Sequence, residues 1–145
     1  MYVNNAPIHV FSPCGRIVYH FAWGAMRHRP VLVADAAQRL AELLQRKAAE
    51  MQIVLRALEI QADRVYVLVE APPTVSPHHI VCGLKACSSG PMRQEFKELT
   101  AMPTLWTRHY LVATGEGLSA SQVLEAFEAT QQPRRPRGRP RCVRS

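Results

Sequence analysis

The chain has 145 residues, 48% of them hydrophobic, which is enough for one globular domain with its own core and too little for two. It has no run of eighteen apolar residues, and its N-terminus MYVNNAPIHV has neither a basic flank nor an apolar stretch, so we expect a cytoplasmic protein without a membrane span. The formal net charge is +7, but six arginines occupy the last twelve positions, so 7 − 6 leaves only +1 for the rest of the chain. This distribution excludes a protein that binds polyanions through a uniformly basic surface.

The first half of the chain predicts a strand, a helix and a hairpin. Arg16–Trp23 alternates β-branched and aromatic residues and predicts a strand. Asp35 is suited to cap a helix over residues 36–50, whose leucines follow helical spacing. Met51–Ile60 and Arg64–Glu70 both predict strands, and the three residues between them are few enough for an antiparallel hairpin.

The second half predicts two more helical regions and a strand. Ser76 followed by Pro77 is typical of a helix start. We expect Ser88–Pro91 to break that helix and a short helical piece to follow around residues 96–99. Leu105–Thr114 predicts a strand that ends at a glycine-rich turn.

A last helix is predicted from a capping box. Ser119 with Gln122 three residues later is typical of a helix N-terminus, and Val123, Leu124 and Phe127 give this helix an apolar side. The order β-α-β-β-α-β-α predicts an α+β fold, a ferredoxin-like antiparallel sheet with an added C-terminal helix.

The cysteines do not form a recognisable metal or redox motif. No Cys-x-x-Cys pair is present, so free thiols are expected at the four positions Cys14, Cys82, Cys87 and Cys142. His78 and His79 with Cys82 have spacings that could bring ligands together on a helix, but no fourth ligand is evident. We interpret these three as residues of a solvent-facing first helical turn.

Several separated segments resemble the single-tyrosine HUH transposases of the insertion-sequence-200-like family and the related REP-associated tyrosine transposases. In order, they are YHFAWGAMRHRPVL, ADRVYVLVEAPP, SPHHIVCGLKACSS, LWTRHYLVATGE and FEATQ. The resemblance spans Ile8 to Gln131. Members of that family carry His-x-His on a strand, which binds Mg²⁺ or Mn²⁺, and Tyr-x-x-x-Gln on a helix, whose tyrosine attacks the scissile phosphate.

The residues of this chain depart from the family at the positions that perform the chemistry. The two histidine positions hold Arg64 and Tyr66, the tyrosine position holds Phe127, and of the four key groups only Gln131 is kept. A guanidinium has no free lone pair, and a phenol must first lose a proton with a pKa of about 10. We therefore expect no metal cofactor and no catalytic residue at these positions.

Arg64 has two interpretations at this stage. Alternate residues of a strand share a face, so Arg64 and Tyr66 project together. Arg64 could then hold a phosphate by bidentate hydrogen bonds where the family holds its metal. It could equally pair with Asp63, Glu59 or Glu70 at the surface.

The resemblance implies a homodimer, joined edge to edge through its sheets, that binds hairpin or single-stranded DNA. The candidate DNA-binding side chains in the body are Arg27, Arg29, Arg64, Lys85 and Arg108. The leading hypothesis is a catalytically inactive, transposase-like DNA-binding protein that regulates or assists transposition. The alternatives are an active transposase or nicking enzyme that uses another tyrosine, Tyr66 or Tyr110, with a rearranged metal site, and a decaying gene product without a role.

The tail supplies a separate indication of nucleic-acid binding. We divide the chain into a transposase-like domain, residues 1–132, and an Arg- and Pro-rich tail, residues 133–145, that cannot build a core and is expected to be disordered. Pro136–Pro140 resembles an AT-hook, with arginines suited to the minor groove of A·T-rich duplex at Arg137, Arg139 and Arg141. The alternative is a solubilising tail. DNA binding would place the protein at the nucleoid of a prokaryote.

Overall fold

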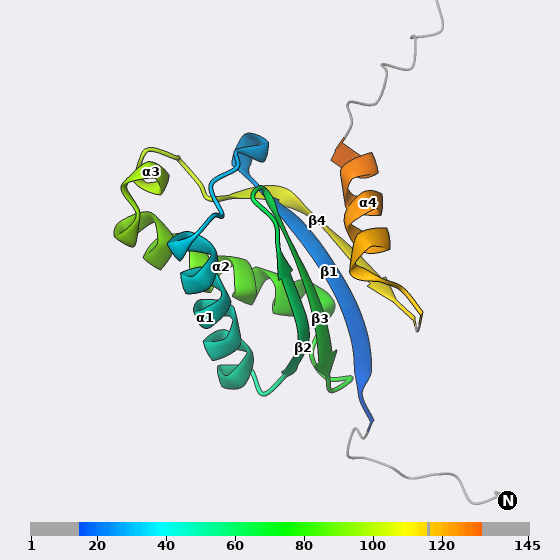
Figure 1. The fold of residues 1–145 in the computed structure, drawn as a ribbon. Coiled ribbons are helices and arrows are strands. Elements are labelled where there is room, and N and C mark those ends of the chain that lie inside the picture. Colours follow the sequence, from blue (N-terminus) through cyan, green and yellow to red (C-terminus); the bar gives the residue numbers. More distant parts are fainter. Residues whose placement is uncertain (1–14, 116, 132–145) are drawn as a thin grey trace, which may run out of the picture.

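The fold is one antiparallel sheet between two layers of helices (Figure 1). The computed structural model describes residues 15–115 and 117–131. The strands lie in the order β2-β3-β1-β4, and their bounds are β1 Ile17–Ala25, β2 Val54–Ile60, β3 Arg64–Ala71 and β4 Trp106–Thr114. The predicted α+β class and the ferredoxin-like order are confirmed. The tail predicted to be disordered lies outside the described residues.

The helices divide between the two faces of the sheet. Figure 1 shows α1 (Asp35–Glu50) and α2 (Pro77–Glu95) on one face and α4 (Ala120–Gln131) on the other. A 3-10 turn, η1 (Met26–His28), follows β1, and the short helix α3 (Lys97–Thr100) follows α2. The described residues therefore form two apolar clusters, a large one under α1 and α2 and a small one under α4.

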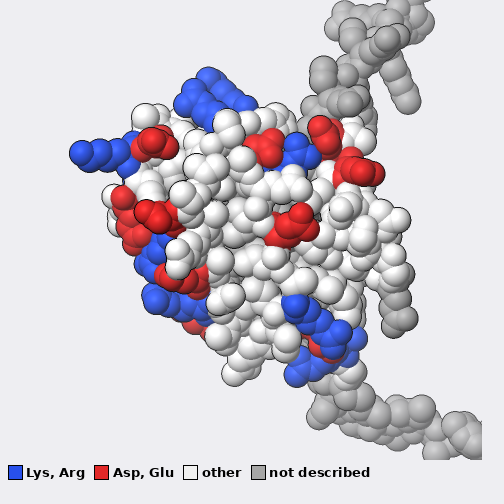
Figure 2. All heavy atoms as spheres, viewed as in Figure 1, with Lys and Arg blue, Asp and Glu red and all other residues white. Residues whose placement is uncertain are grey.

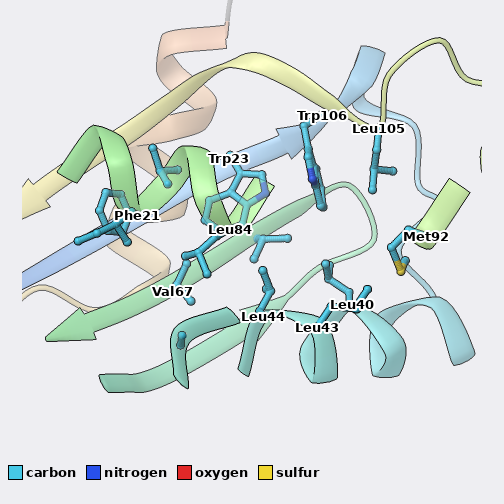
Figure 3. Packing of buried hydrophobic residues seen from close by; sticks show 14 of the residues in the cluster. Phe21, Trp23, Leu40, Leu43, Leu44, Val67, Leu84, Met92, Leu105 and Trp106 are labelled. Atoms are coloured by element: carbon cyan, nitrogen blue, oxygen red, sulfur yellow. The ribbon is translucent and has the colours of Figure 1, made fainter. Parts of the chain in front are cut away.

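The large core is built from the odd-numbered residues of β1 and the apolar sides of α1 and α2 (Figure 3). Trp23 meets Trp106 edge to face, with ring centroids 5.9 Å apart. Leu40 and Leu44 of α1 and Leu84 of α2 are fully buried against these rings. Each such side chain contributes about 1.5–3 kcal/mol by burial, so this layer carries most of the stability of the fold.

The start of β2 differs from the prediction because the end of α1 extends into it. We expected a strand from Met51, but Gln52 has a positive φ of 59°, and the amides of Gln52 and Ile53 donate to the carbonyls of Ala49 and Ala48. Residues 51–53 thus terminate the helix, and β2 begins at Val54.

Asp35 does not cap α1 as predicted. The N-cap position is Ala34, and Asp35 is the first residue of the helix, with no side-chain capping bond. Its charge still lies in the first turn, where a carboxylate interacts favourably with the helix dipole.

The predicted break at Ser88–Pro91 is wrong, since α2 runs through it to Glu95. Gly90 precedes the proline and has no Cβ to clash with the proline ring, which lowers the usual cost of a helical residue at that position. The helix is also held on both sides of the proline, because Ser88 and Met92 are fully buried. Tertiary packing therefore outweighs the local signal.

Three local predictions are confirmed. The β2–β3 hairpin closes with a 2.8 Å bond from the Gln61 amide to the Arg64 carbonyl. Ser76 caps α2 by accepting from the His79 amide, and Ser119 and Gln122 form the reciprocal bonds of a capping box at α4. Within the described residues, no helix is long and apolar enough to cross a membrane.

Candidate functional site

Helix α4 covers the face of the sheet on which the family would place its chemistry. Val123, Leu124 and Phe127 are its buried residues, and they pack against Ala22 of β1 and Tyr66 of β3. The capping box fixes where the helix starts, so these three side chains, spaced one turn or less apart, face the sheet together.

Phe127 is held closely by the strand beneath it. Its side chain is 1% exposed, and a Cβ added to Gly24 would lie 3.2 Å from its Cε1 atom. Glycine at position 24 therefore lets the ring approach the backbone of β1. Packing of this kind uses the ring and offers no oxygen for attack on a phosphate.

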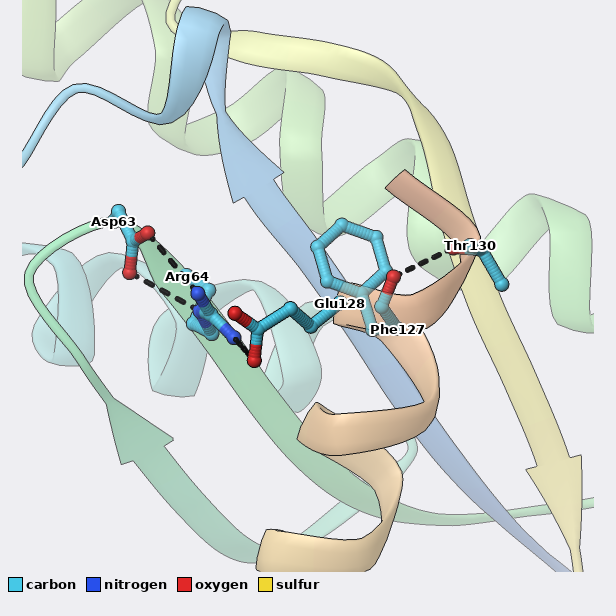
Figure 4. Close-up of polar contacts among 5 residues, drawn as sticks. All are labelled: Asp63, Arg64, Phe127, Glu128 and Thr130. Carbon is cyan, nitrogen blue, oxygen red and sulfur yellow. Dashed lines mark hydrogen bonds and ion pairs between the residues drawn. The ribbon is translucent and has the colours of Figure 1, made fainter. Parts of the chain in front are cut away.

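Arg64 is engaged by two carboxylates (Figure 4). Its Nε and Nη2 donate to the two carboxylate oxygens of Asp63 at 3.1 and 3.2 Å, and its Nη1 donates to Glu128 at 3.2 Å. The Asp63 hydrogen bonds are the main reason why the pKa of Arg64 is raised. Pairing with Asp63 was one of the two sequence interpretations; Glu128, brought in by α4, was not foreseen.

Tyr66 belongs to a buried hydrogen-bonded chain that sequence reasoning missed. Its hydroxyl lies 2.8 Å from Nδ1 of His20, and Nε2 of His20 lies 3.0 Å from the carbonyl oxygen of Gly115. A carbonyl can only accept, so Nε2 carries the proton and Nδ1 accepts from the phenol. Tyr66 and His20 are each 3% exposed. Burial, followed by the nearby charge of Glu59, raises the pKa of Tyr66.

The hydrogen-bonded series of Tyr66, His20 and the Gly115 carbonyl has the parts of an activated nucleophile: a phenol, and a base that a third group orients. The signal in the sequence was the alternation of β1, which puts His20 on the same face as Ala22. The hydroxyl, however, lies beneath α4 and away from solvent.

Arg64 and Tyr66, which the resemblance matches to the family's metal ligands, have side chains that do not fit Mg²⁺ or Mn²⁺. Arg64 brings a positive charge and no lone pair, and the Tyr66 hydroxyl donates its proton to His20. Across residues 15–115 and 117–131, no three His, Cys, Asp or Glu side chains are grouped so that they could hold a metal ion. Gln131 ends α4, and its side chain lies outside the described residues.

Four of the body's predicted DNA-binding residues surround two adjoining hollows near η1. A hollow of about 480 Å³ between α2 and the start of β4 is lined by Lys85 and Arg108, with Trp106 in its wall. A second of about 160 Å³ is lined by Arg27 and Arg29. Both hollows are lined by Met26 and Pro103 as well, and we call the two together the α2–β4 groove.

The groove is basic at its rim and apolar inside. Arg27, Arg29 and Arg108 are exposed, whereas Lys85 is half-buried, donates to the Thr107 carbonyl, and has its pKa lowered by burial. Figure 2 shows one group of Lys and Arg side chains over η1, while the basic side chains over α1 and at the lower end of the sheet lie next to acidic ones. Arg64, held by carboxylates on the α4 side of the sheet, does not belong to this group.

The tail residues Arg137, Arg139 and Arg141, and the AT-hook-like Pro136–Pro140, lie outside the described residues. The structure thus adds nothing to the predictions made for them.

Comparison with known proteins places the chain in a family. A family model described as "Transposase IS200 like" matches residues 14–127, most of the chain. The chain belongs to the IS200-like transposase family. The matched range runs from just before β1 to Phe127 on α4, so it contains Arg64 and Tyr66 as well as the groove.

Individual relatives agree with this family. The chain is 26% identical over 117 residues to the ISDra2 transposase TnpA of Deinococcus radiodurans, covering 79% of this chain and 84% of that protein. A crystal structure of a Deinococcus radiodurans protein assigned as a transposase superposes with a TM-score of 0.73 at 28% identity, covering 80% of this chain and 92% of the other. A REP-associated tyrosine transposase bound to a REP hairpin shares the fold, with a TM-score of 0.54, 6% identity, and coverage of 86% and 68%.

Proposed function

We propose that this member of the IS200-like family binds hairpin or single-stranded DNA without cutting it, and that it regulates or assists transposition. The observation that carries the proposal is the state of the α4 face: Arg64 is paired with Asp63 and Glu128, and Phe127, which the resemblance matches to the attacking tyrosine, is a buried ring without a hydroxyl. A scaffold in this state can keep its binding surfaces while lacking its chemistry.

The DNA surface in this proposal is the α2–β4 groove. Arg27, Arg29 and Arg108 offer exposed cations to a phosphate backbone, and Trp106 gives the hollow an apolar wall. A structural neighbour with the same fold is bound to a REP hairpin, which supports a structured DNA as the ligand. The groove borders α2, which lies on the face of the sheet opposite α4, so the loss of catalytic residues under α4 need not disturb the groove.

Two further parts of the proposal concern assembly and the tail. The edge strands β2 and β4 expose Val54 and Val112, which supports a homodimer joined through a sheet edge. The tail would add contacts to A·T-rich duplex next to the hairpin. Such a protein would act in the cytoplasm, at the nucleoid of a prokaryote.

The test is incubation of the full chain with hairpin-bearing single-stranded DNA and Mg²⁺ or Mn²⁺, followed by a denaturing gel and a binding titration. We expect binding and no covalent adduct. A protein–DNA adduct formed by the unchanged chain would refute the absence of cleavage, and failure to bind any hairpin would refute the DNA ligand. The variant with Arg64→His, Tyr66→His and Phe127→Tyr then asks whether the scaffold still supports cleavage.

The surface is tested by single substitutions at its rim. Arg27→Ala and Arg108→Ala should each weaken DNA binding and flatten its dependence on salt by about 0.7–0.9 in the logarithmic slope per lost phosphate contact. Arg56→Ala is the matched control, since this exposed arginine pairs with Glu70 and lies on β2, at the edge of the sheet opposite β4. Equal losses in all three variants would argue for a diffuse charge effect instead of a groove.

One observation favours a second candidate, an enzyme that uses Tyr66. His20 lies at hydrogen-bond distance and could take the phenol proton. Against it, the hydroxyl is covered by α4 and its pKa is raised. In the adduct assay, peptide mapping of a phosphotyrosine to Tyr66 would establish this candidate over the first.

A further inference from the structure

Three polar side chains meet where α2 starts and β4 passes it. The Sγ atom of Cys82 lies 3.4 Å from Nε2 of His78, one helical turn earlier, and Nδ1 of His78 lies 3.0 Å from the hydroxyl of Tyr110. Cys82 and His78 are both exposed. The sulfur also lies 3.8 Å from Nδ1, so the thiol packs against the imidazole ring, nearer to Nε2, while the phenol meets Nδ1.

This cluster opens into the α2–β4 groove. Cys82, Lys85 and Arg108 all line the larger hollow, so the sulfur faces a cavity of about 480 Å³ with two cations in its wall. Burial lowers the pKa of Lys85, and the neighbouring Cys82 partly offsets this effect. The Cys82 thiol is thus in contact with an imidazole and has a cation nearby that would stabilise a thiolate.

The second described cysteine has the opposite environment on the same helix. Cys87 is half-buried, its thiol donates to the Leu84 carbonyl at 3.2 Å, and burial raises its pKa to about 11. At neutral pH almost none of it is thiolate, the form that reacts. Two cysteines five residues apart thus form a natural pair for comparison.

We propose that Cys82 is a peroxide-reactive thiol, oxidised ahead of Cys87, and that its oxidation obstructs the α2–β4 groove. The S–H proton passes to Nε2 of His78, and the thiolate attacks one oxygen of a hydroperoxide. The O–O bond breaks, Cys82 becomes a sulfenic acid, and the leaving alkoxide or hydroxide takes the proton from His78. Sulfur is oxidised by two electrons and the hydroperoxide is reduced to an alcohol or water.

The consequence for DNA rests on the proposed function. The sulfenic acid adds an oxygen to the Cys82 side chain, in the hollow lined by Lys85 and Arg108 where phosphate would have to approach. The chemistry of the thiol itself does not depend on DNA. The two halves can therefore be tested separately.

The first test measures reactivity on the full chain without DNA. Hydrogen peroxide or iodoacetamide is added near pH 7.5, and labelling is followed by mass spectrometry after trypsin, which separates Cys82 in peptide 65–85 from Cys87 in peptide 86–93. We expect the exposed Cys82 to react about 10²-fold faster than Cys87, because burial raises the pKa of Cys87 to about 11 and leaves little of its thiolate near pH 7.5.

The role of the imidazole is isolated by a matched pair of substitutions. His78→Ala should slow the reaction at Cys82 by roughly tenfold and leave the rate at Cys87 unchanged. This factor is smaller than the usual contribution of a positioned general base to a reaction rate. His79→Ala, the next residue and also exposed, should change the rate at Cys82 by less than about twofold. Equal rates at the two cysteines, or equal effects of the two substitutions, would overturn the proposal.

The second test measures hairpin affinity before and after peroxide, with the peroxide removed by catalase. We expect oxidation to weaken binding about tenfold or more, equivalent to about 1.4 kcal/mol. The Cys82→Ala variant should show no change between its treated and untreated forms. An equal loss in that variant would overturn the link between Cys82 and the groove. If the reduced chain binds no hairpin, the proposed function fails, while the first test still decides the reactivity of the thiol.

Discussion

Replacing Tyr66 by phenylalanine tests the buried hydrogen-bonded chain under α4. The change removes one oxygen and leaves the ring in place, so packing against Leu124 and Phe127 is kept. It also leaves Nδ1 of His20 as a buried acceptor without its partner. An unsatisfied buried polar atom costs about 1–3 kcal/mol, and we expect a loss of about 2 kcal/mol in the free energy of unfolding.

The chain supplies its own control for this experiment. Tyr110 also bonds to Nδ1 of a histidine, His78, at 3.0 Å, but that pair is at the surface. Water can replace the lost hydroxyl there, so Tyr110→Phe should cost less than about 0.5 kcal/mol. In urea, with a slope of ~2 kcal/mol/M, the midpoint should fall by about 1 M for Tyr66→Phe and by less than about 0.25 M for Tyr110→Phe.

The raised pKa of Tyr66 adds a dependence on pH with a definite sign. The folded state favours the neutral phenol, so its stabilisation is complete below the ordinary tyrosine pKa of about 10 and is lost as the pH rises through the higher folded pKa. The Tyr66→Phe variant has no such loss, so the difference in unfolding free energy between it and the unchanged chain should become smaller above pH 10. Equal deficits for the two tyrosine variants, or a gap that stays constant to high pH, would refute the buried pairing.

Three other predictions concern the α4 face and the tail. Gly24→Ala should destabilise the fold by about 1–3 kcal/mol, because the Cβ of the new alanine would press on the Phe127 ring and on a backbone oxygen. Gly83→Ala is the control, since the flexible Met51 side chain can move away from the added Cβ, and thermal melts should show little change. Arg64→Ala should leave hairpin affinity and its salt dependence unaltered and cost under about 1 kcal/mol; a weaker affinity would restore its phosphate role. Truncation after residue 132 should lower affinity for A·T-rich duplex and flatten its slope against salt, and an unchanged slope would favour a solubilising tail.

Local signals predicted two helix starts and one hairpin correctly, although Asp35 is the first residue of α1 and not its cap. The capping box at Ser119, the Ser76–Pro77 start of α2 and the β2–β3 hairpin all depend on contacts within four residues, and all three are present. Pro91 misled the prediction because the burial of Met92 on the opposite side of the break is a long-range effect.

The candidate site shows the same division. Strand alternation was enough to place Arg64 and Tyr66 on one face, as the pairing of β3 with β1 requires. The partners of these side chains come from distant segments: Glu128 is 64 residues from Arg64, and His20 is 46 residues from Tyr66. The grouping of Arg27 with Arg108 likewise depends on η1 lying beside β4, which no local pattern encodes.

The unequal sizes of the two apolar clusters have a consequence for local unfolding of the molecule. In the described part of the chain, helix α4 packs on the sheet through the buried side chains of Val123, Leu124 and Phe127, and Glu128 pairs with Arg64. The other layer holds both tryptophans and the leucines of α1 and α2. The helix can detach as a unit while the remaining layer stays intact. Its amides should exchange with deuterium well before those of β1, and each such opening would let water reach the imidazole of His20.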